Sequence, residues 1–343
     1  MQFWYMETRP NISSQSIREA RERIDHMVHR TPVLHSSAIN ELAGCDLFFK
    51  CENFQKVGAF KARGAANAVL KLSKKDRENG VATHSSGNHA AALARAAQVA
   101  KIPAYIVMPS NAPEVKKQAV KGYGGIVIEC EPNLQAREQG LKDVVKEFGA
   151  IFIPPYDHLD VIEGQATCAL EIFDAGYSLD TLLTPVGGGG LLAGTALAAS
   201  FYSPNTKVIG AEPEGADDAR RSFVAGYRIP MEKPNTIADG LLTSLGEINF
   251  NIISNHVQDI LTVSDAQIIS AMRLIYERMK IVIEPSCAVP LAVVLKNKSL
   301  FEGQKVGIIL SGGNVDLSKL PFKTRTFNSV SRNHSSGSYF VGL

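Results

Sequence analysis

Glu52-Asn53-Phe54-Gln55-Lys56-Val57-Gly58-Ala59-Phe60-Lys61-Ala62-Arg63-Gly64-Ala65-Ala66 connects an expected strand to an expected helix. The apolar run at 46–51 predicts the strand, and the pattern at 65–71 predicts the helix. Lys61 therefore lies at a strand-to-helix junction, directly after Phe60. An apolar cover near a helix N-terminus lowers the pKa of a lysine and makes its amine a usable nucleophile. The alternative is a solvated lysine at the start of a helix.

Outward from this junction, short apolar runs alternate with helical patterns over most of the chain. This alternation predicts an α/β fold whose parallel strands are covered by helices on both faces, with ligands bound at the carboxyl ends of the strands. Ser16-Ile17-Arg18-Glu19 is a capping-box pattern and predicts the start of the first helix. We expect strands at 46–52, 81–84, 104–109, 125–130, 150–154, 181–186, 207–212, 260–263 and 305–310, and helices at 61–75, 88–100, from 113, 134–148, 160–176, 190–201, 265–280 and 287–297.

Composition narrows the class of protein. The 343 residues are 45% hydrophobic and carry a formal charge of +2, which gives no electrostatic reason to expect a nucleic acid or an anionic membrane as partner. No apolar run reaches the length of a membrane span, and Met1–Met6 lacks the features of a secretory signal. The five scattered cysteines predict reduced thiols in a cytoplasmic protein. Residues 322–343 show no periodicity, so we expect a disordered tail there.

Four consecutive glycines, Gly187, Gly188, Gly189 and Gly190, follow an expected strand and open an expected helix. Their backbone N–H groups can surround an anion, and the helix N-terminus adds partial positive charge. We therefore predict a phosphate site. The pattern Gly188-x-Gly190-x-x-Ala193, with Glu212 ending the next strand, also fits a dinucleotide fingerprint, so a nicotinamide-dependent oxidoreductase stays open at this point.

Polar side chains follow three further strands. His84-Ser85-Ser86-Gly87-Asn88-His89 offers hydroxyl, amide and imidazole groups beside a helix start, which suits a carboxylate or a phenolate oxygen, although an ordinary N-cap would look similar. Ser311 begins a glycine-rich turn and could present its hydroxyl to a ring nitrogen. The segment 212–218 holds four carboxylates, which predicts either a divalent-cation site or a solvated acidic loop.

Together these stretches resemble the fold-type II pyridoxal-phosphate enzymes, the tryptophan-synthase-β-like group, and within it the serine racemase and serine/threonine dehydratase family. The resemblance runs from about Ile17 to Leu320. It rests on Phe60-Lys61-Ala62-Arg63-Gly64, Ser85-Ser86-Gly87-Asn88-His89, the four glycines at 187–190, Thr236-Ile237-Ala238-Asp239-Gly240, Glu277-Arg278-Met279-Lys280 with Glu284-Pro285, and Ser311-Gly312-Gly313-Asn314.

The resemblance implies two three-layer αβα domains, a large one at 1–76 and 156–321 and a smaller one inserted at 77–155. It also implies a homodimer. Lys61 would carry pyridoxal 5'-phosphate covalently beside Phe60, and Ser311 would meet the pyridine nitrogen. A neutral hydroxyl leaves that nitrogen unprotonated, which favours elimination over transamination. The resemblance assigns the cofactor phosphate to Gly187, Gly188, Gly189 and Gly190, and the ring hydroxyl to Asn88. It assigns the substrate carboxylate to Ser85, Asn88 and His89, with Arg137 and Thr243 closing over it. It assigns a magnesium, manganese or calcium ion to Glu212, the Ala216 carbonyl and Asp218.

By the same resemblance, the substrate is a small amino acid and Lys61 removes its α-proton. Loss of a β-hydroxyl then gives an oxo acid and ammonia, whereas a proton returned from the opposite face gives the enantiomer. Ser86 is the predicted donor on that face, and it favours a racemase because threonine dehydratases usually have alanine there. A 3-hydroxyaspartate ammonia-lyase would share these motifs, and a catalytically silent metabolite sensor on the same fold would not need Lys61.

Overall fold

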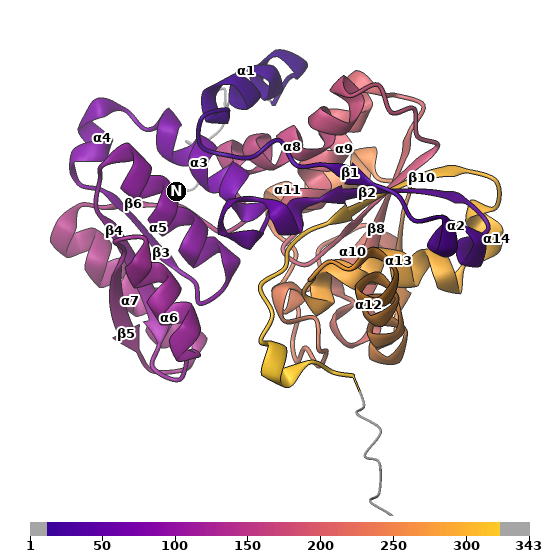
Figure 1. The fold of residues 1–343 in the computed structure, drawn as a ribbon. Helices are drawn as coiled ribbons and strands as arrows, with labels where there is room; N and C mark the ends of the chain where they lie inside the picture. The colour runs from indigo at the N-terminus through magenta and orange to yellow at the C-terminus, as the bar shows by residue number, and fades with distance from the viewer. Residues whose placement is uncertain (1–11, 323–343) are drawn as a thin grey trace, which may run out of the picture.

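A computed structural model describes residues 12–322 of the chain. The predicted tail at 322–343 lies outside this range except for Phe322, whose ring packs edge-on against Tyr276 with centroids 5.4 Å apart. The described residues form two units side by side, each built on its own sheet with helices on both faces (Figure 1). The predicted α/β class and three-layer organisation are therefore confirmed. The exact domain boundaries at 76/77 and 155/156 stay predictions.

The larger sheet has six strands in the order β1-β2-β10-β7-β8-β9. All neighbours are parallel except β1, which runs antiparallel to β2. Strand β10, which comes late in the sequence, lies between β2 and β7. The residues that follow β2, β10 and β7 are therefore at the same edge of the sheet, although they are far apart in the sequence. The strands are β1 (Val33–Leu34), β2 (Asp46–Cys51), β7 (Thr181–Pro185), β8 (Lys207–Pro213), β9 (Asp259–Val263) and β10 (Lys305–Leu310).

Alternate residues of this sheet face different helical layers. Leu182 and Ile309 pack in one core with α8 and α9, whereas Leu183 and Ile308 pack in another with α12 and α13. This alternation is the period of two expected of a strand buried on both faces. The helices of this unit are α1 (Ser14–Ile24), α2 (Ser37–Ala43), α8 (Leu159–Asp174), α9 (Gly190–Tyr202), α10 (Asp218–Ala225), α11 (Glu247–His256), α12 (Asp265–Met279), α13 (Pro285–Lys296) and α14 (Lys298–Phe301).

The smaller sheet has four parallel strands in the order β5-β4-β3-β6. Val81 and Ile106 share a core with α3 and α5, and Ala82 and Val107 share another with α7. The elements of this unit are α3 (Lys61–Lys71), α4 (Lys74–Glu78), β3 (Val81–His84), α5 (Asn88–Ala100), β4 (Ala104–Pro109), α6 (Glu114–Gly122), β5 (Ile126–Cys130), α7 (Leu134–Phe148) and β6 (Ile151–Phe152).

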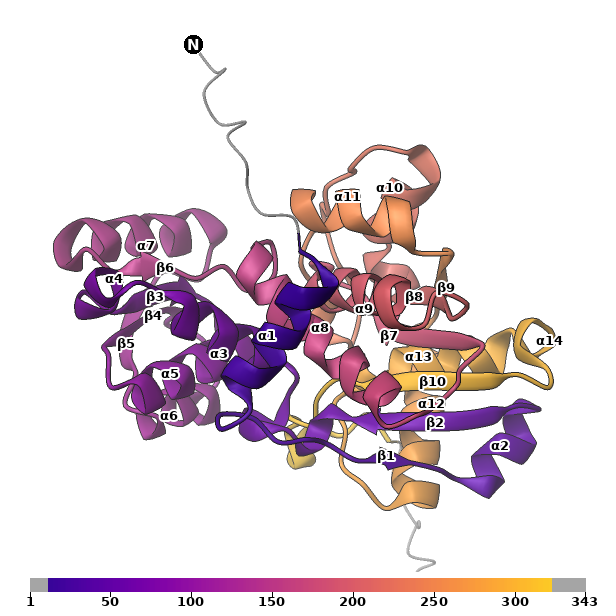
Figure 2. The same ribbon diagram turned by 90° about the horizontal axis from the view of Figure 1, so that it is seen from above.

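Helix α3 joins the two units. It packs against α5 of the small unit and against α8 of the large one, and α1 lies across α3 and α8 (Figure 2). Glycines allow α3 and α8 to approach closely, because a Cβ on Gly164 would lie only 2.7 Å from the Cα of Gly64. The residue at the start of α3 is therefore held by both units.

Three expectations about local structure need correction. The first helix begins at Ser14 with Ser13 as N-cap, and Ser16 completes the capping box as its third residue instead of starting it. Strand β6 covers only two residues, since the prolines at 154 and 155 have no N–H group to continue a ladder. The short antiparallel β1 and helices α2, α10 and α11 were not predicted, because their apolar positions are too few to show a clear period.

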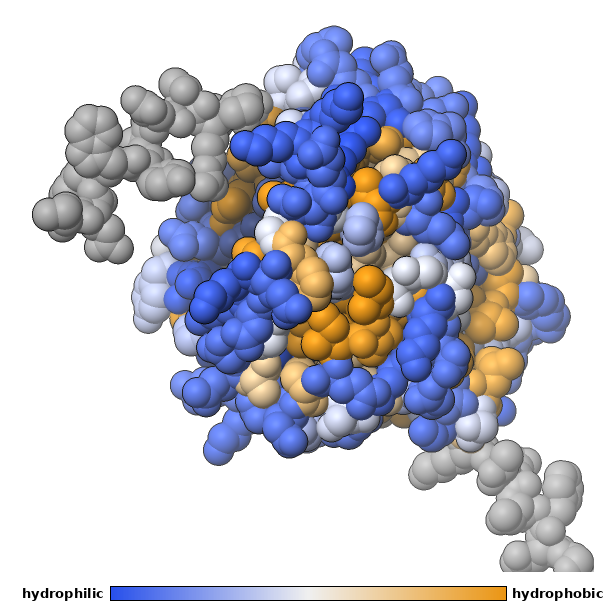
Figure 3. All heavy atoms as spheres, turned by 90° about the vertical axis from the view of Figure 1, so that its left-hand side faces the viewer, coloured by the Kyte–Doolittle hydropathy of each residue, from blue (hydrophilic) through white to orange (hydrophobic). Residues whose placement is uncertain are grey.

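The outer side of the small unit is mainly hydrophilic with one compact hydrophobic area (Figure 3). Ile126, Phe148 and Phe152 are large hydrophobic residues of this unit that stay exposed. Within residues 12–322, no helix is long and apolar enough to cross a membrane.

Candidate active site

Lys61 is the first residue of α3, as predicted. Two 3-10 turns, Glu52–Phe54 and Lys56–Gly58, separate it from the end of β2. Its Nζ donates a hydrogen bond to the carbonyl of Pro155 at 2.6 Å. The backbone N–H of Phe60 donates to the carbonyl of Ser311, and Ala59 forms a bridge with Gly312. The predicted lysine stretch and the Ser311 stretch are therefore joined by backbone hydrogen bonds.

Burial lowers the pKa of Lys61 to about 8, even though Glu284 acts in the opposite direction. The Nζ atom also lies 5.1 Å from the ring centroid of Phe60 and 5.9 Å from that of Tyr156. A pKa near 8 leaves an appreciable fraction of the amine unprotonated at neutral pH, as a nucleophile and base requires. The prediction of an amine with a lowered pKa agrees with this environment, and the alternative of a solvated lysine does not.

A buried charge network holds the junction around Lys61. The guanidinium of Arg63 is fully buried and contacts Glu52 through Nε at 2.7 Å and Glu171 through both terminal nitrogens at 2.9 Å. Lys50 reaches the same Glu171 at 2.6 Å. Burial alone would raise the pKa of Glu171, but the neighbouring Arg63 and Lys50 outweigh it and bring this pKa to about 2. The network thereby fixes the end of β2, the 3-10 turn at Glu52, and the helices α3 and α8 relative to each other.

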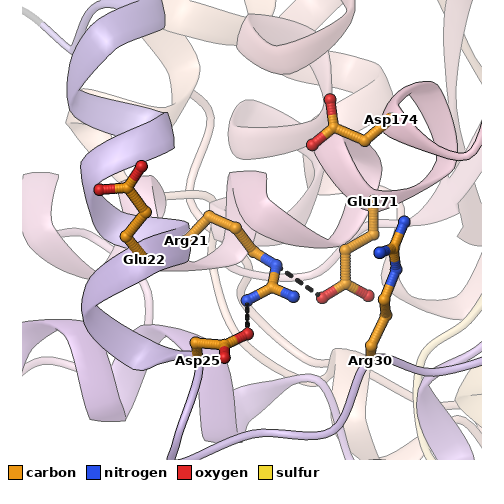
Figure 4. A pocket seen from close by; sticks show the side chains of 6 residues that line it. All are labelled: Arg21, Glu22, Asp25, Arg30, Glu171 and Asp174. Carbon is orange, nitrogen blue, oxygen red and sulfur yellow. Dashed lines mark hydrogen bonds and ion pairs between the residues drawn. The ribbon is translucent and has the colours of Figure 1, made fainter.

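Glu171 also lies at a cavity of about 480 Å³ (Figure 4). Charged residues line this cavity, and Arg21 bridges Asp25 and Glu171 across it. None of the predicted catalytic or ligand-binding residues lies in its wall. The cavity therefore belongs to the outer end of the charge network and not to the site around Lys61.

The four glycines form the turn between β7 and α9, and all are buried. Among residues 12–322, no acceptor is found for the backbone N–H groups of Gly187–Gly190. Free N–H groups at a helix N-terminus are the donors that bind phosphate. The loop thus has the free donors that the predicted phosphate site requires, and the site itself stays a prediction.

The glycine loop is also shaped by its neighbours. A Cβ at Gly188 would lie 2.3 Å from the Tyr156 ring, and Gly189 has a φ of 93°. The Asn249 side chain donates to the carbonyl of Gly188 at 2.7 Å. Tyr156 thus lies against the loop while its ring is 5.9 Å from Lys61 Nζ, which brings the loop and the lysine to one place.

The 85–89 loop leads into α5, whose first residue is Asn88. Within the described chain, the backbone N–H groups of Asn88 and His89 have no acceptor, so this helix start also has free donors of the kind that bind an anion. The His89 ring is buried, its Nε2 lies 3.0 Å from the Ile153 carbonyl, and its Nδ1 is unpaired. Burial lowers the pKa of His89 to about 3, so the ring is neutral with its proton on Nε2. Its backbone N–H group is therefore better suited to a carboxylate than its imidazole.

Glu284 lies in this cluster, although the sequence predicts no role for it beyond its place in a motif. Its two carboxylate oxygens accept hydrogen bonds from Asn88 Nδ2 at 3.0 and 3.1 Å, and Asn314 donates to Asn88 Oδ1 at 2.9 Å. Burial raises the pKa of Glu284 to about 7. This arrangement fixes the orientation of the Asn88 amide. Only the position of Glu284 before a helix-starting proline could have indicated it.

The remaining predicted residues lie around this cluster at different distances. Ser311 is buried at the end of β10, and the Thr243 hydroxyl is hydrogen-bonded to Tyr156 beside the glycine loop. Ser86 is partly buried between Ser85 and Asn88. Arg137 lies on α7, where its charge lowers the pKa of His84 after the larger effect of burial. No contact links Arg137 to Lys61 within the described residues.

Two of the four carboxylates in the segment 212–218, those of Glu212 and Asp218, are buried, whereas Glu214 is exposed and Asp217 is partly exposed. The Glu212 carboxylate accepts backbone N–H groups of Ala219 and Arg220 at 3.0 and 2.8 Å. Asp218 Oδ2 accepts from Leu245 at 2.7 Å, and its Oδ1 is buried without a partner. Burial raises the pKa of Glu212 well above its ordinary range and that of Asp218 to about 6.

Two buried carboxylates and one unsatisfied oxygen fit a divalent cation, and a solvated loop does not explain them. Residues 12–322 contain no group of three His, Cys, Asp or Glu side chains arranged for a metal. The predicted set has two such side chains and the Ala216 carbonyl, so the cation itself is a matter for proposal.

All five cysteines are free, as predicted, and four of them are buried. They lie within the described part of the chain and take no part in the contacts around Lys61.

Two α/β units with a lysine of lowered pKa near a glycine loop whose N–H groups are free agree with the class of fold-type II pyridoxal-phosphate enzymes. The chain belongs to the family of pyridoxal-phosphate-dependent enzymes, whose family model matches residues 24–312. The nicotinamide alternative gains no support from this membership.

Individual relatives extend over nearly the whole chain. A β-hydroxyaspartate dehydratase of Paracoccus denitrificans is 52% identical over 303 residues, which cover 88% of this chain and 96% of the relative. A serine racemase of Dictyostelium discoideum is 48% identical over 319 residues, or 92% and 98% of the two chains. The solved structure of maize serine racemase matches with a TM-score of 0.88 at 46% identity and covers 90% and 95%.

Proposed function

We propose that the chain is a racemase and ammonia-lyase that acts on L-serine and L-threonine with pyridoxal 5'-phosphate. The observation that carries the proposal is the environment of Lys61, an amine of lowered pKa that directly follows the residues paired with the Ser311 turn and lies near Tyr156, which packs on the glycine loop. The similarity to serine racemases supports the choice of substrate.

Gly187, Gly188, Gly189 and Gly190 would hold the cofactor phosphate through their free N–H groups, with Phe60 and Asn88 beside the ring and Ser311 at its nitrogen. When bound, pyridoxal phosphate withdraws electrons from the α-carbon of an amino acid and so acidifies its α-proton. Lys61 would hold the cofactor covalently, and its Nζ, once displaced by the substrate's amino group, would take this proton. Its pKa of about 8 suits an amine that must accept and release a proton near neutral pH.

The start of α5 would bind the substrate carboxylate. The free N–H groups of Asn88 and His89 and the hydroxyl of Ser85 point to this role, because a helix N-terminus stabilises an anion. Thr243 and Arg137 close the site in this proposal. Glu284 keeps the Asn88 side chain oriented through its paired hydrogen bonds.

Ser86 would return a proton to the face of the α-carbon opposite Lys61. Racemisation needs such a donor and elimination of water does not, so Ser86→Ala should lower D-serine formation about 100-fold or more while pyruvate formation survives. Both products are measured in one incubation with L-serine. The matched control is Ser85→Ala, which should lower both products because it weakens carboxylate binding. Equal loss of both products in Ser86→Ala would assign Ser86 to substrate binding instead.

A 3-hydroxyaspartate ammonia-lyase is the second candidate, favoured by the 52% identity to a β-hydroxyaspartate dehydratase. Such a substrate carries a second carboxylate, which the charge of Arg137 beside His84 could attract. The ratio of kcat/KM for 3-hydroxyaspartate, serine and threonine distinguishes the candidates. A preference for 3-hydroxyaspartate that Arg137→Ala abolishes would select the second one.

We further propose that Glu212, the Ala216 carbonyl and Asp218 bind magnesium, manganese or calcium. The support is the unpartnered buried oxygen of Asp218 and the raised pKa of both carboxylates.

A homodimer and a cytoplasmic location complete the proposal, and the five free cysteines agree with a reducing compartment. Light scattering on the purified holoenzyme tests the dimer.

A further inference from the structure

An apolar groove lies on the large unit, away from the residues assigned to catalysis. It has a volume of about 490 Å³ and runs between the start of α8 and the helices α9 and α11. Asn251, Asn255 and His256 supply its polar rim. Its apolar wall consists of Ile12, Leu159, Leu197, Phe201, Ile248 and Ile252.

The first described residue of the chain forms part of this wall. Ile12 packs against the core shared by α8, α9 and α11 and lines the groove, so the point at which residues 1–11 are attached lies in the groove wall. Eleven residues precede it, and they include Phe3-Trp4-Tyr5-Met6. Trp4 is eight residues from Ile12, which allows a reach of up to about 28 Å in an extended chain.

We propose that residues 1–11 fold back onto the groove and place the side chains of Phe3, Trp4 and Tyr5 on its apolar wall. Phe201 is 40% exposed on this wall and leaves apolar surface to be covered. An aromatic side chain buries roughly 150–250 Å². The tether at Ile12 makes this segment a favoured occupant over a separate chain, since a short tether acts like a millimolar local concentration.

The experiment uses the full-length holoenzyme and the fluorescence of Trp4, which is the only tryptophan of the chain. We expect emission at shorter wavelength than that of a synthetic peptide of residues 1–12, and a several-fold smaller acrylamide quenching constant. Phe201→Asp should shift the emission and the quenching towards those of the peptide. Leu300→Asp is the matched control, because Leu300 is 55% exposed on α14 and does not line the groove.

A second variant keeps the test independent of the folding of the groove. Phe3→Asp combined with Tyr5→Asp changes only the segment and should expose Trp4 in the same way. The proposal is overturned if wild-type Trp4 is quenched as readily as the peptide, or if Phe201→Asp leaves an initially protected Trp4 unchanged. Protection that appears only at concentrations at which light scattering detects association would assign the groove to a second copy, and would also overturn it.

Discussion

Lys61 and Arg63 lie two residues apart in α3, and their surroundings act on their charges in opposite ways. Burial lowers the pKa of Lys61 to about 8. Burial would also lower the pKa of Arg63, but Glu52 and Glu171 raise it well above its ordinary range. One residue is thus kept permanently charged and anchored, while the other is free to exchange a proton. The anchor fixes the helix turn from which the reactive amine projects.

Arg63→Ala should reduce the free energy of unfolding by about 3–5 kcal/mol, because it leaves two buried carboxylates without their main partner. Urea denaturation followed by circular dichroism measures this loss. The control is Arg273→Ala, which breaks an exposed pair with Glu277 on α12 and should cost about 0.5 kcal/mol or less. Similar losses in both variants would mean that the buried network does not stabilise the junction.

At the scale of elements, the candidate active site is formed by turns that connect the carboxyl ends of strands to the first residues of helices. The turns after β7 and β3 each lead directly into a helix whose first N–H groups are free, and the turn after β10 pairs with the segment before α3. Each turn therefore depends on close backbone packing as well as on its polar groups. Substitutions that only add volume should disturb binding without changing any charge.

Gly188→Ala tests this at the glycine loop. The added methyl group would lie 2.3 Å from the Tyr156 ring, so the loop or the ring must move and cofactor affinity should fall at least tenfold. Titration with pyridoxal phosphate, followed by visible absorbance, gives the affinity. Gly122→Ala is the control, since a Cβ there meets nothing within 4 Å and the position ends α6. Unchanged affinity in Gly188→Ala would contradict the packing argument.

The segment between β8 and α10 carries the prediction for a cation. Burial raises the pKa of Asp218 to about 6 from an ordinary value of 3.8. Without a cation, the stability that this group contributes is present below the ordinary value and is lost as the pH rises through about 6. A cation binds the ionised form, so its stabilising effect should grow as the pH rises through the same range.

Magnesium at a hundredfold excess over its Kd should stabilise the EDTA-treated protein by about 2.7 kcal/mol above pH 7 and by clearly less at pH 5. Thermal unfolding measures the effect. Asp218→Ala should remove it, whereas Asp217→Ala should keep it, because Asp217 is paired with Arg221 and is outside the predicted set. A Tm that does not respond to EDTA, magnesium, manganese or calcium would contradict the cation site.

For the whole molecule, the sequence predicts those features of the fold that depend on regular hydrophobic periodicity. Long apolar strands and helices repeat with clear periods, so the α/β class and the stretches at strand ends could be predicted from them, whereas the two three-layer units were implied by the family resemblance. The position of Glu284 against Asn88 could not, because 196 residues separate them and no local pattern reports such a contact. The short β1, β6, α10 and α11 were missed or misjudged for a related reason, since tertiary packing and not periodicity defines them.

The protonation states of single residues are harder to predict from the sequence than their positions in motifs. The pKa of Lys61 depends on burial by residues from both units, which a strand-to-helix pattern can indicate but not quantify. The neutral state of His89 follows mainly from burial of its ring, and the hydrogen bond to the Ile153 carbonyl acts in the opposite direction on its pKa. Side-chain chemistry is therefore predictable as a list of groups, and its protonation is not.

The formation of pyruvate from L-serine by the wild type and by Lys61→Ala is the measurement that tests the central proposal most directly. The visible absorbance of the bound cofactor is recorded in the same samples. Because the proposal assigns both the covalent link to the cofactor and the removal of the α-proton to one residue, Lys61→Ala should lose the visible band and all detectable pyruvate. A Lys61→Ala protein that keeps both the band and the turnover would contradict the assignment.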